Sequence, residues 1–238
     1  MWNSKRYHSF DFDCRERFGK KLYKLSLNAG FTCPNRDGTL GTRGCIFCSA
    51  GGSGDFAASS KLTITEQIGQ ARQLVAAKNP SGQYIAYFQA YTNTYAPLPV
   101  LEHVFFEAAS HPDIAALSIA TRPDCLGREV LSLLKRLSEI KPVTVELGLQ
   151  TIHENSAAFV RRGYPLNVYE EAVWALDSAG IDIVTHLILG LPGETLPDML
   201  ATVHHVCTLP LSGLKLQLLY VLKGTDLATH FAAHPQAY

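Results

Sequence analysis

Short apolar runs alternate with amphipathic stretches from Leu22 onward, at the spacing expected of repeated strand–helix units. The apolar runs predict six strands, at 22–28, 83–90, 114–121, 143–150, 181–190 and 213–222. The amphipathic stretches predict helices at 65–78, 99–110, 127–140, a broken pair near 154–161 and 168–179, and 196–207. Neighbouring strands that are joined by helical crossovers run parallel, so the pattern predicts an α/β fold with a parallel sheet.

Polar and apolar residues alternate within several of these strands. The fourth predicted strand contains VELGLQ (145–150), which places its valine and leucines on one face and its glutamate, glycine and glutamine on the other. The fifth strand places His186, Ile188 and Gly190 together. A sheet covered by helices on both faces would show nearly continuous apolar runs. The pattern therefore favours a curved sheet with helices outside and a roomy, ligand-filled interior over a tightly packed closed barrel.

Each predicted strand is followed by a polar or glycine-rich segment. The carboxyl ends of the strands in such a fold line one face, where active sites lie, so these segments are expected to converge. Glu146 faces the polar interior in this arrangement. An ionised carboxylate there needs a cationic partner such as Lys24 or Arg162.

Three cysteines lie in the long glycine-rich loop after the first strand. Cys33, Cys45 and Cys48 form a Cys-x11-Cys-x2-Cys motif, and no fourth cysteine or histidine stands at a suitable spacing. A structural zinc site normally demands a fourth ligand. An iron–sulfur cubane that is held by three thiolates keeps one iron open for another ligand. The spacing therefore favours a cluster with an open iron over a zinc loop.

The composition is that of an ordinary globular protein, and one domain is the simplest count for 238 residues. Lysine plus arginine equals aspartate plus glutamate, at 21 each, so net charge indicates neither a nucleic-acid nor a membrane partner. Residues 1–24 are locally basic. We expect a solvated leader to the first strand there, with a polyanion-binding arm as the alternative.

The sequence shows no signal peptide and no apolar run long enough to span a membrane. Six cysteines with three in one loop do not resemble a secreted disulfide framework. A reducing cytoplasm is the expected compartment. Oligomeric state leaves no mark in the sequence.

The motifs at the strand ends resemble those of the radical S-adenosylmethionine (SAM) superfamily, from about residue 20 to 230. Four motifs carry the resemblance: FTCPNRDGT (31–39), SIATRPDCL (118–126), VELGLQT (145–151) and HLILGLPGET (186–195). They look like successive strand-end motifs of the Elongator-type and coproporphyrinogen-oxidase-like branches. In this order they most resemble the YhcC/YtqA-like radical SAM family of bacteria.

The resemblance implies a partial (β/α)6 TIM-like barrel of the radical SAM type. This core domain is expected at 25–238, after the leader at 1–24 and without a C-terminal segment that would cap the barrel or bind substrate. It implies a [4Fe-4S] cluster on the three cysteines and SAM at the open iron, cleaved reductively to a 5′-deoxyadenosyl radical that abstracts hydrogen. The implied SAM contacts are Phe47, Gln150, Arg162, Ile188 and Gly190.

The chain also departs from the pattern of its relatives. Gln89 to Thr94 stands where a Gly-Gly-Glu often receives the SAM amino group, and Ala120 takes the place of a frequent glutamate. His186 occupies a position often filled by glycine or aspartate, and Glu194 falls one residue late. His186 is expected either as a hydrogen-bonded barrel residue or as a site residue.

The resemblance further implies a tRNA substrate and modification of a wobble-uridine side chain, such as a 5-carboxymethylaminomethyl group. An electron donor such as flavodoxin or ferredoxin is implied as a partner. No acetyltransferase domain follows, so Elongator-type acyl transfer is not supported. Two alternatives remain: radical SAM chemistry on a small metabolite, and a non-enzymatic iron–sulfur or zinc protein that senses redox state or delivers electrons.

Overall fold

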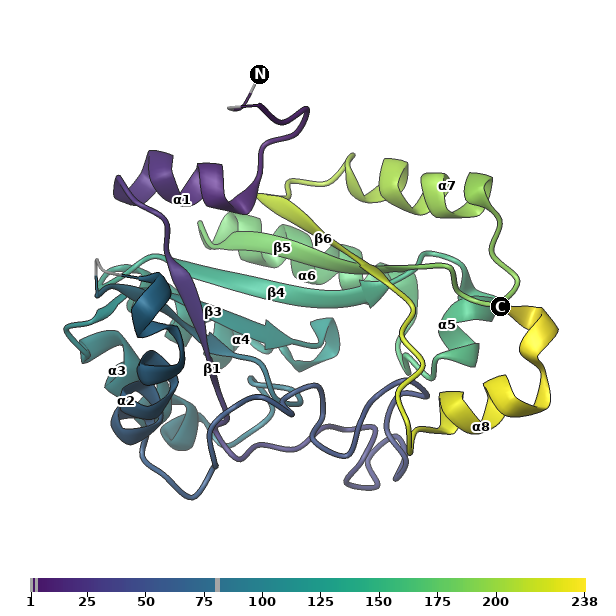
Figure 1. Ribbon diagram of the computed structural model, residues 1–238, viewed down its shortest axis with the longest axis horizontal. Helices are drawn as coiled ribbons and strands as arrows, with labels where there is room; N and C mark the ends of the chain where they lie inside the picture. The colour runs from purple at the N-terminus through teal and green to yellow at the C-terminus, as the bar shows by residue number, and fades with distance from the viewer. Residues whose placement is uncertain (1, 3, 80–81) are drawn as a thin grey trace.

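A single parallel sheet organises the computed structural model, which describes residues 2, 4–79 and 82–238. Its strands are β1 (Tyr23–Leu27), β2 (Tyr84–Phe88), β3 (Ile114–Thr121), β4 (Val143–Gln150), β5 (Asp182–Leu189) and β6 (Gly213–Leu218). Spatial order follows chain order, and all neighbours pair in parallel. The sheet is curved, and β1 and β6 are its two edges. The sheet is therefore an open half-barrel rather than a closed barrel (Figure 1).

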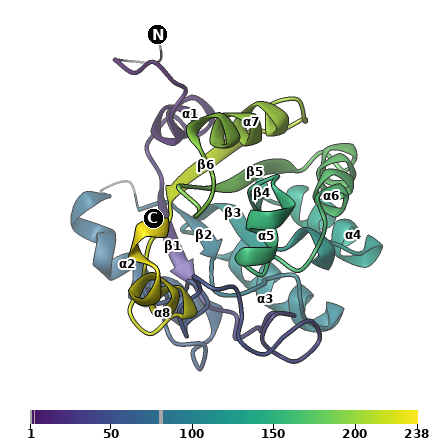
Figure 2. The same ribbon diagram turned by 90° about the vertical axis from the view of Figure 1, so that its right-hand side faces the viewer.

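Helices connect the strands and cover the outer face of the sheet (Figure 2). They are α2 (Ile64–Val75), α3 (Leu98–Ser110), α4 (Arg128–Ser138), α5 (Glu154–Phe159), α6 (Leu166–Ser178) and α7 (Leu196–Val206). Side chains set several starts: Thr63 and Glu66 form a capping box before α2, and Thr195 and Asp198 form another before α7. The predicted strands and helices are confirmed, with ends shifted by a few residues.

Two helices lie outside the predictions, namely α1 (Phe10–Phe18) and α8 (Asp226–Ala233). Helix α1 falls within the segment that was expected as a solvated leader. It begins at a serine cap, and Cys14 is buried against Leu22 and Ile85. This part of the N-terminal segment is therefore packed against the sheet rather than solvated.

The main apolar core lies between the outer face of the sheet and helices α2, α3, α4 and α6. Helix α3 contributes Phe105, whose ring meets that of Phe88 edge to face with centroids 4.9 Å apart. Leu133 and Leu137 of α4 and Tyr169 of α6 are fully buried there. The inner face carries the polar residues instead, as the alternation in the sequence predicts. None of the described helices combines the length and apolar character needed to cross a bilayer.

Candidate active site

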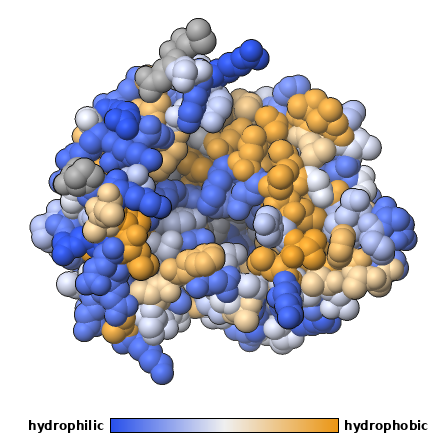
Figure 3. All heavy atoms as spheres, viewed as in Figure 1, coloured by the Kyte–Doolittle hydropathy of each residue, from blue (hydrophilic) through white to orange (hydrophobic). Residues whose placement is uncertain are grey.

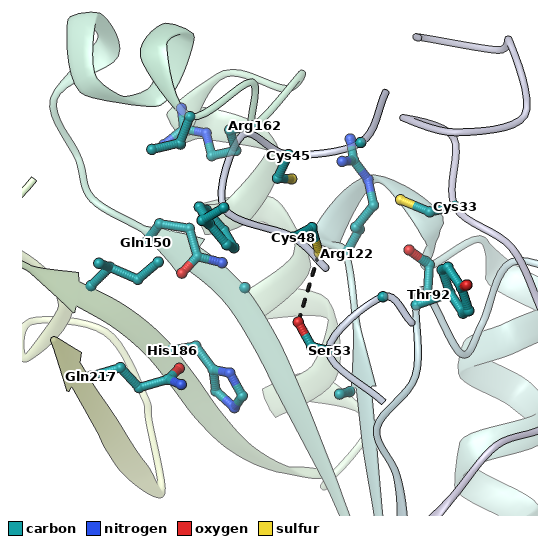
Figure 4. Close-up of a pocket in the computed structure, with 18 of the residues that line it drawn as sticks. Cys33, Cys45, Cys48, Ser53, Thr92, Arg122, Gln150, Arg162, His186 and Gln217 are labelled. Atoms are coloured by element: carbon teal, nitrogen blue, oxygen red, sulfur yellow. Dashed lines mark hydrogen bonds between the residues drawn. The ribbon is translucent and has the colours of Figure 1, made fainter. Parts of the chain in front are cut away.

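A cavity of about 280 Å³ opens at the carboxyl ends of the strands. The cysteine loop forms one wall, and the segments after β2, β3, β4 and β6 form others (Figure 4). The predicted convergence of strand-end segments is therefore confirmed for these elements. The segment after β5 is not among the described residues that line the cavity: Ile188 of β5 lines it, and Gly190 does not.

All three motif cysteines are free thiols that line this cavity. Asn35 Nδ2 donates to Cys45 Sγ at 3.4 Å, and Cys48 Sγ lies 3.7 Å from Ser53 Oγ. Arg36 donates from Nη2 to the Ser49 carbonyl at 2.5 Å, which ties the first part of the loop to the last. The loop is thus ordered by its own polar side chains, with the sulfurs directed inward (Figure 4).

The chemistry of the cysteines fits an iron–sulfur cluster better than a single metal ion. In the described chain, no group of three or more His, Cys, Asp or Glu side chains is placed to hold one metal ion. A single zinc would need its ligands gathered around one point, whereas a cubane spreads three thiolates over three irons. Burial raises the pKa of the Cys45 thiol to about 12, so its thiolate form requires nearby positive charge such as iron.

Arg122, from the TRPDC motif after β3, supplies one positive charge beside the cysteines (Figure 4). Asp124 accepts from its Nε at 2.9 Å and from its Nη2 at 2.7 Å. Burial acts to lower the pKa of Arg122, yet the bond to Asp124 raises it overall. The guanidinium is therefore firmly charged and fixed in place at the cysteine end of the cavity.

Helix α8 fastens the cysteine loop from outside. Asp226 binds Arg43 and Arg161 through its two carboxylate oxygens, at 2.5 Å each. The Leu227 amide donates to the Ile46 carbonyl at 2.9 Å. These bonds hold the middle of the loop between α8 and the connection from α5 to α6.

Strained backbone gathers around the same cavity. In the described residues, φ is positive at four non-glycine positions: Ser53, Tyr91, Gln150 and Arg161. The first three line the cavity. Gln150 ends β4 at a break in the pairing register with β5, which turns its side chain toward the cavity (Figure 4). Strain of this kind persists where surrounding structure enforces it, and it is common at functional sites.

Arg162 is 2% exposed and lines the cavity. Its guanidinium donates to the carbonyls of Tyr164 at 2.8 Å and Thr151 at 2.7 Å, and to the Glu154 carboxylate at 2.7 Å. The side chain therefore braces the segment after β4, and its charge is already paired. A SAM contact at this position stays a prediction.

The other predicted SAM contacts lie at different depths. Phe47 and Ile188 line the cavity and belong to one small apolar cluster with Val160. Gly190 lies past the end of β5, with a φ of +79° and its amide 3.2 Å from Met199 Sδ. An adenine beside Phe47 and Ile188 thus has an apolar surface available, while the predicted contact at Gly190 stays untested.

One polar side chain from each strand meets halfway down the inner face, and together they form what we call the polar layer. Its members are Lys24, Tyr87, Ser118, Glu146, His186 and Lys215. Glu146 is at its centre, with a fully buried side chain that pairs with Lys24 and accepts from Ser118. The expected ion pair with Lys24 is confirmed. The alternative with Arg162 is wrong, because Glu154 takes that guanidinium.

The polar layer perturbs the acids and bases within it. Burial alone would raise the pKa of Glu146, but His186 and the two lysines hold it well below its usual range. Burial lowers the pKa of His186, whose Nε2 lies 2.5 Å from Glu146 Oε2. His186 also lines the cavity, so it combines both expected roles. The sequence analysis did not identify Tyr87, Ser118 and Lys215 as members of this layer, although each stands at an inward position of its strand.

The fold and the cysteine-lined cavity define a class, and the comparison with protein families identifies it. The model of the radical SAM superfamily matches residues 37–206. The chain therefore belongs to the radical SAM superfamily, as its motifs predict. It is an enzyme of that class, whose cofactors are a [4Fe-4S] cluster and SAM. This finding disfavours the non-enzymatic redox protein.

Close relatives narrow the family. YtqA of Bacillus subtilis is 44% identical over 227 residues, which cover 95% of this chain and 70% of the relative. YhcC of Escherichia coli K12 is 38% identical over 234 residues, covering 98% of this chain and 74% of YhcC. The chain is thus a member of the YhcC/YtqA-like radical SAM family.

Two more distant proteins share part of the chain or its fold. A tRNA uridine(34) acetyltransferase of Dehalococcoides mccartyi is 32% identical over 124 residues, which cover 51% of this chain and 26% of that protein. The structure of archaeal Methanocaldococcus infernus Elp3 superposes with a TM-score of 0.65 at 15% identity, covering 89% of this chain and 49% of Elp3. The predicted half-barrel of the radical SAM type is confirmed.

Proposed function

We propose that this enzyme modifies the side chain of a wobble uridine in tRNA by abstracting a hydrogen atom. The observation that carries the proposal is the partial similarity to a tRNA uridine(34) acetyltransferase, whose name gives a tRNA uridine as its substrate. The similarity covers about half of this chain, so it supports the substrate class and not the acetyl transfer. A carboxymethylaminomethyl group on the uridine is the side chain we propose.

The charge of the cavity supports an anionic substrate. Four cationic side chains line it, Arg36, Arg122, Arg162 and Lys215, against one acidic residue in the described chain, Glu146. Asp124 and Glu154 pair with Arg122 and Arg162, so Arg36 and Lys215 carry the positive charge that an anionic substrate would meet.

Different residues of the site are proposed to hold the cluster and SAM. When bound, the cluster and SAM supply the reductive cleavage that produces a hydrogen-abstracting radical. Cys33, Cys45 and Cys48 would hold the cluster, and Phe47 and Ile188 would give the adenine an apolar surface.

The electron donor is proposed to be a flavodoxin or ferredoxin, and the compartment a reducing cytoplasm. All six cysteines are free, which supports such a compartment. The locally basic segment 1–24 reaches the site through Lys24, which pairs with Glu146.

The test begins with anaerobic reconstitution, dithionite reduction and an assay for 5′-deoxyadenosine. We expect wild type to form it from SAM, and Cys45→Ala to form none because one cluster ligand is missing. Adding tRNA that carries 5-carboxymethylaminomethyluridine should raise the yield, and nucleoside analysis should show loss of that nucleoside.

Unmodified transcripts of the same tRNA are the matched control. Cleavage of SAM with no change in any tRNA nucleoside would reject the tRNA proposal and favour a small-metabolite substrate. Such a substrate would show no salt-dependent RNA binding.

A further inference from the structure

The polar layer holds more positive charge than its carboxylate neutralises. Glu146 accepts from Lys24 and Ser118 on one oxygen and faces His186 and Lys215 with the other. With His186 neutral, as its lowered pKa favours, two ammonium groups remain against one carboxylate. One positive charge is therefore left over in a partly enclosed space, and such a charge is most stable beside an anion.

Lys215 is the ammonium with the weaker contacts. Its Nζ lies 3.6 Å from Glu146 Oε2, 3.3 Å from the Tyr87 hydroxyl and 5.3 Å from the centre of the Tyr87 ring. Lys24 contacts the carboxylate directly and lies over the Tyr87 and Phe10 rings at 4.6 Å and 5.0 Å. An ammonium group has three donors, so Lys215 retains capacity for another acceptor. Burial lowers its pKa, as expected of a cation that lacks full compensation.

Lys215 lies between two cavities, a second one on the far side of the polar layer and the cysteine cavity. Lys215 lines that cavity, and so does Gln217, two residues further along β6 on the same inner face. Two residues of strand advance the chain by about 6.6 Å, which places Gln217 nearer the cysteines. Gln217 is an exposed residue of the strand, and Figure 4 shows its side chain beside His186.

The other cations of the cavity are already engaged. Arg122 forms two bonds with Asp124, and Arg162 pairs with Glu154. Arg36 donates to carbonyls of the cysteine loop. Lys215 is thus the lining cation that is best able to accept a new negatively charged partner.

We propose that Lys215, with Gln217, forms the subsite that receives an anionic group of the substrate, a carboxylate or a phosphate, on the inner face of β6 beside the polar layer. The inference rests on the proposed function for the identity of the substrate, since we assign to this subsite the carboxylate of the uridine side chain. The ammonium supplies charge and the amide supplies a second donor. Together they set how far the substrate enters below the cysteines.

The experiment compares two synthetic anticodon stem-loops that differ only at the wobble uridine. One carries a 5-carboxymethylaminomethyl group and the other a 5-aminomethyl group, which lacks the carboxylate. Binding is measured under anaerobic conditions with reconstituted protein and no reductant, so turnover plays no part. Iron content and thermal unfolding verify that each variant is folded and loaded.

Wild type should bind the carboxylate-bearing RNA about tenfold more tightly, the value of one charge-assisted hydrogen bond. Lys215→Met should abolish this preference, and Lys215→Arg should restore much of it. Lys223→Met is the matched control, because Lys223 is exposed and the substitution removes the same charge. It should weaken both complexes equally and keep the preference.

Full preference in Lys215→Met, or equal binding of both RNAs by wild type, would overturn the subsite. So would a loss of SAM binding in Lys215→Met, which would assign the lysine to the cofactor. If neither RNA binds, the tRNA proposal fails, and calorimetric titration with acetate and inorganic phosphate decides the subsite. Anion binding by wild type but not by Lys215→Met would then support it, and binding by neither protein would reject it.

Discussion

The two faces of β4 differ more than any other pair of adjacent surfaces in the half-barrel. Val145, Leu147 and Leu149 point outward and are wholly buried in the main core. The residues between them point inward, where a buried carboxylate, a glycine and a strained glutamine meet the cavity. One strand thus stabilises the fold with one face and builds the site with the other, so each property can be changed separately.

The open form of the half-barrel explains why the inner face of the sheet can differ from the outer face. A closed barrel of this type fills its interior with layers of side chains. Here β1 and β6 remain apart, and the interior holds the polar layer and cavities on either side of it. The apolar free energy of folding therefore comes mainly from the outer face, and the inner face is available for ligands.

The largest effect on stability is expected from a substitution on the outer face of β4. Leu147→Ala should lower the free energy of unfolding by about 2–5 kcal/mol, the usual loss for a leucine in a packed core. Urea unfolding of the apo-protein measures it. Leu74→Ala is the matched control, since Leu74 of α2 is 80% exposed, and it should change stability by less than about 0.5 kcal/mol. Equal losses in the two variants would contradict the assignment of the core.

A smaller effect is expected from the centre of the inner face. Glu146→Gln removes a buried, hydrogen-bonded carboxylate, and we expect a loss of about 1–3 kcal/mol at neutral pH. Its pKa is depressed in the folded state, so its stabilisation is present above the ordinary value of 4.5 and is lost as pH falls below it.

Unfolding curves between pH 7 and 3 measure this dependence. Wild type should lose stability through that range, and Glu146→Gln should lose less. Glu139→Gln, at an exposed carboxylate after α4, is the control and should follow wild type. A variant curve parallel to that of wild type would mean that Glu146 is not the group responsible.

A substitution at Gly148, on the inner face of β4, is expected to have the smallest effect on stability and to test the role of that face in binding. A Cβ added at Gly148 would lie 2.9 Å from Gln150 Nε2, the far end of a flexible side chain. Gly148→Ala should therefore change stability by less than about 0.5 kcal/mol but displace Gln150, and equilibrium dialysis should show weaker SAM binding. Gly127→Ala, which meets open space, is the control. Unchanged SAM affinity in Gly148→Ala would remove Gln150 from the proposed contacts.

Periodicity predicted most of the fold because short apolar runs and amphipathic stretches alternate regularly along the chain. It missed α1 and α8 for physical reasons. Helix α1 has little apolar asymmetry, with Cys14 as its one buried residue, and α8 is short, buries Leu227 alone and pairs Asp226 with two arginines. One buried residue in a helix produces no periodic pattern of apolar residues, so neither helix could be predicted from periodicity.

The candidate site was predicted in part. Local motifs revealed the cysteines, because three thiolates in one loop lie close whatever the fold does. Lys215 escaped notice because its partner Glu146 lies far away in the chain, and only the register between strands brings them together. The expected pairing of Arg162 with Glu146 was wrong because Arg162 pairs with Glu154, which lies nearer to it in the chain.

The bond between Arg43 and Asp226 joins residues 183 positions apart. During synthesis the N-terminal part of a chain emerges first, so the cysteine loop leaves the ribosome long before α8 exists to hold it. The loop receives this support only after all six strands of the sheet have been made. A nascent chain therefore presents its three thiols before α8 can hold the loop, and the contacts of Asp226 with Arg43 and Arg161 form only once α8 has been made.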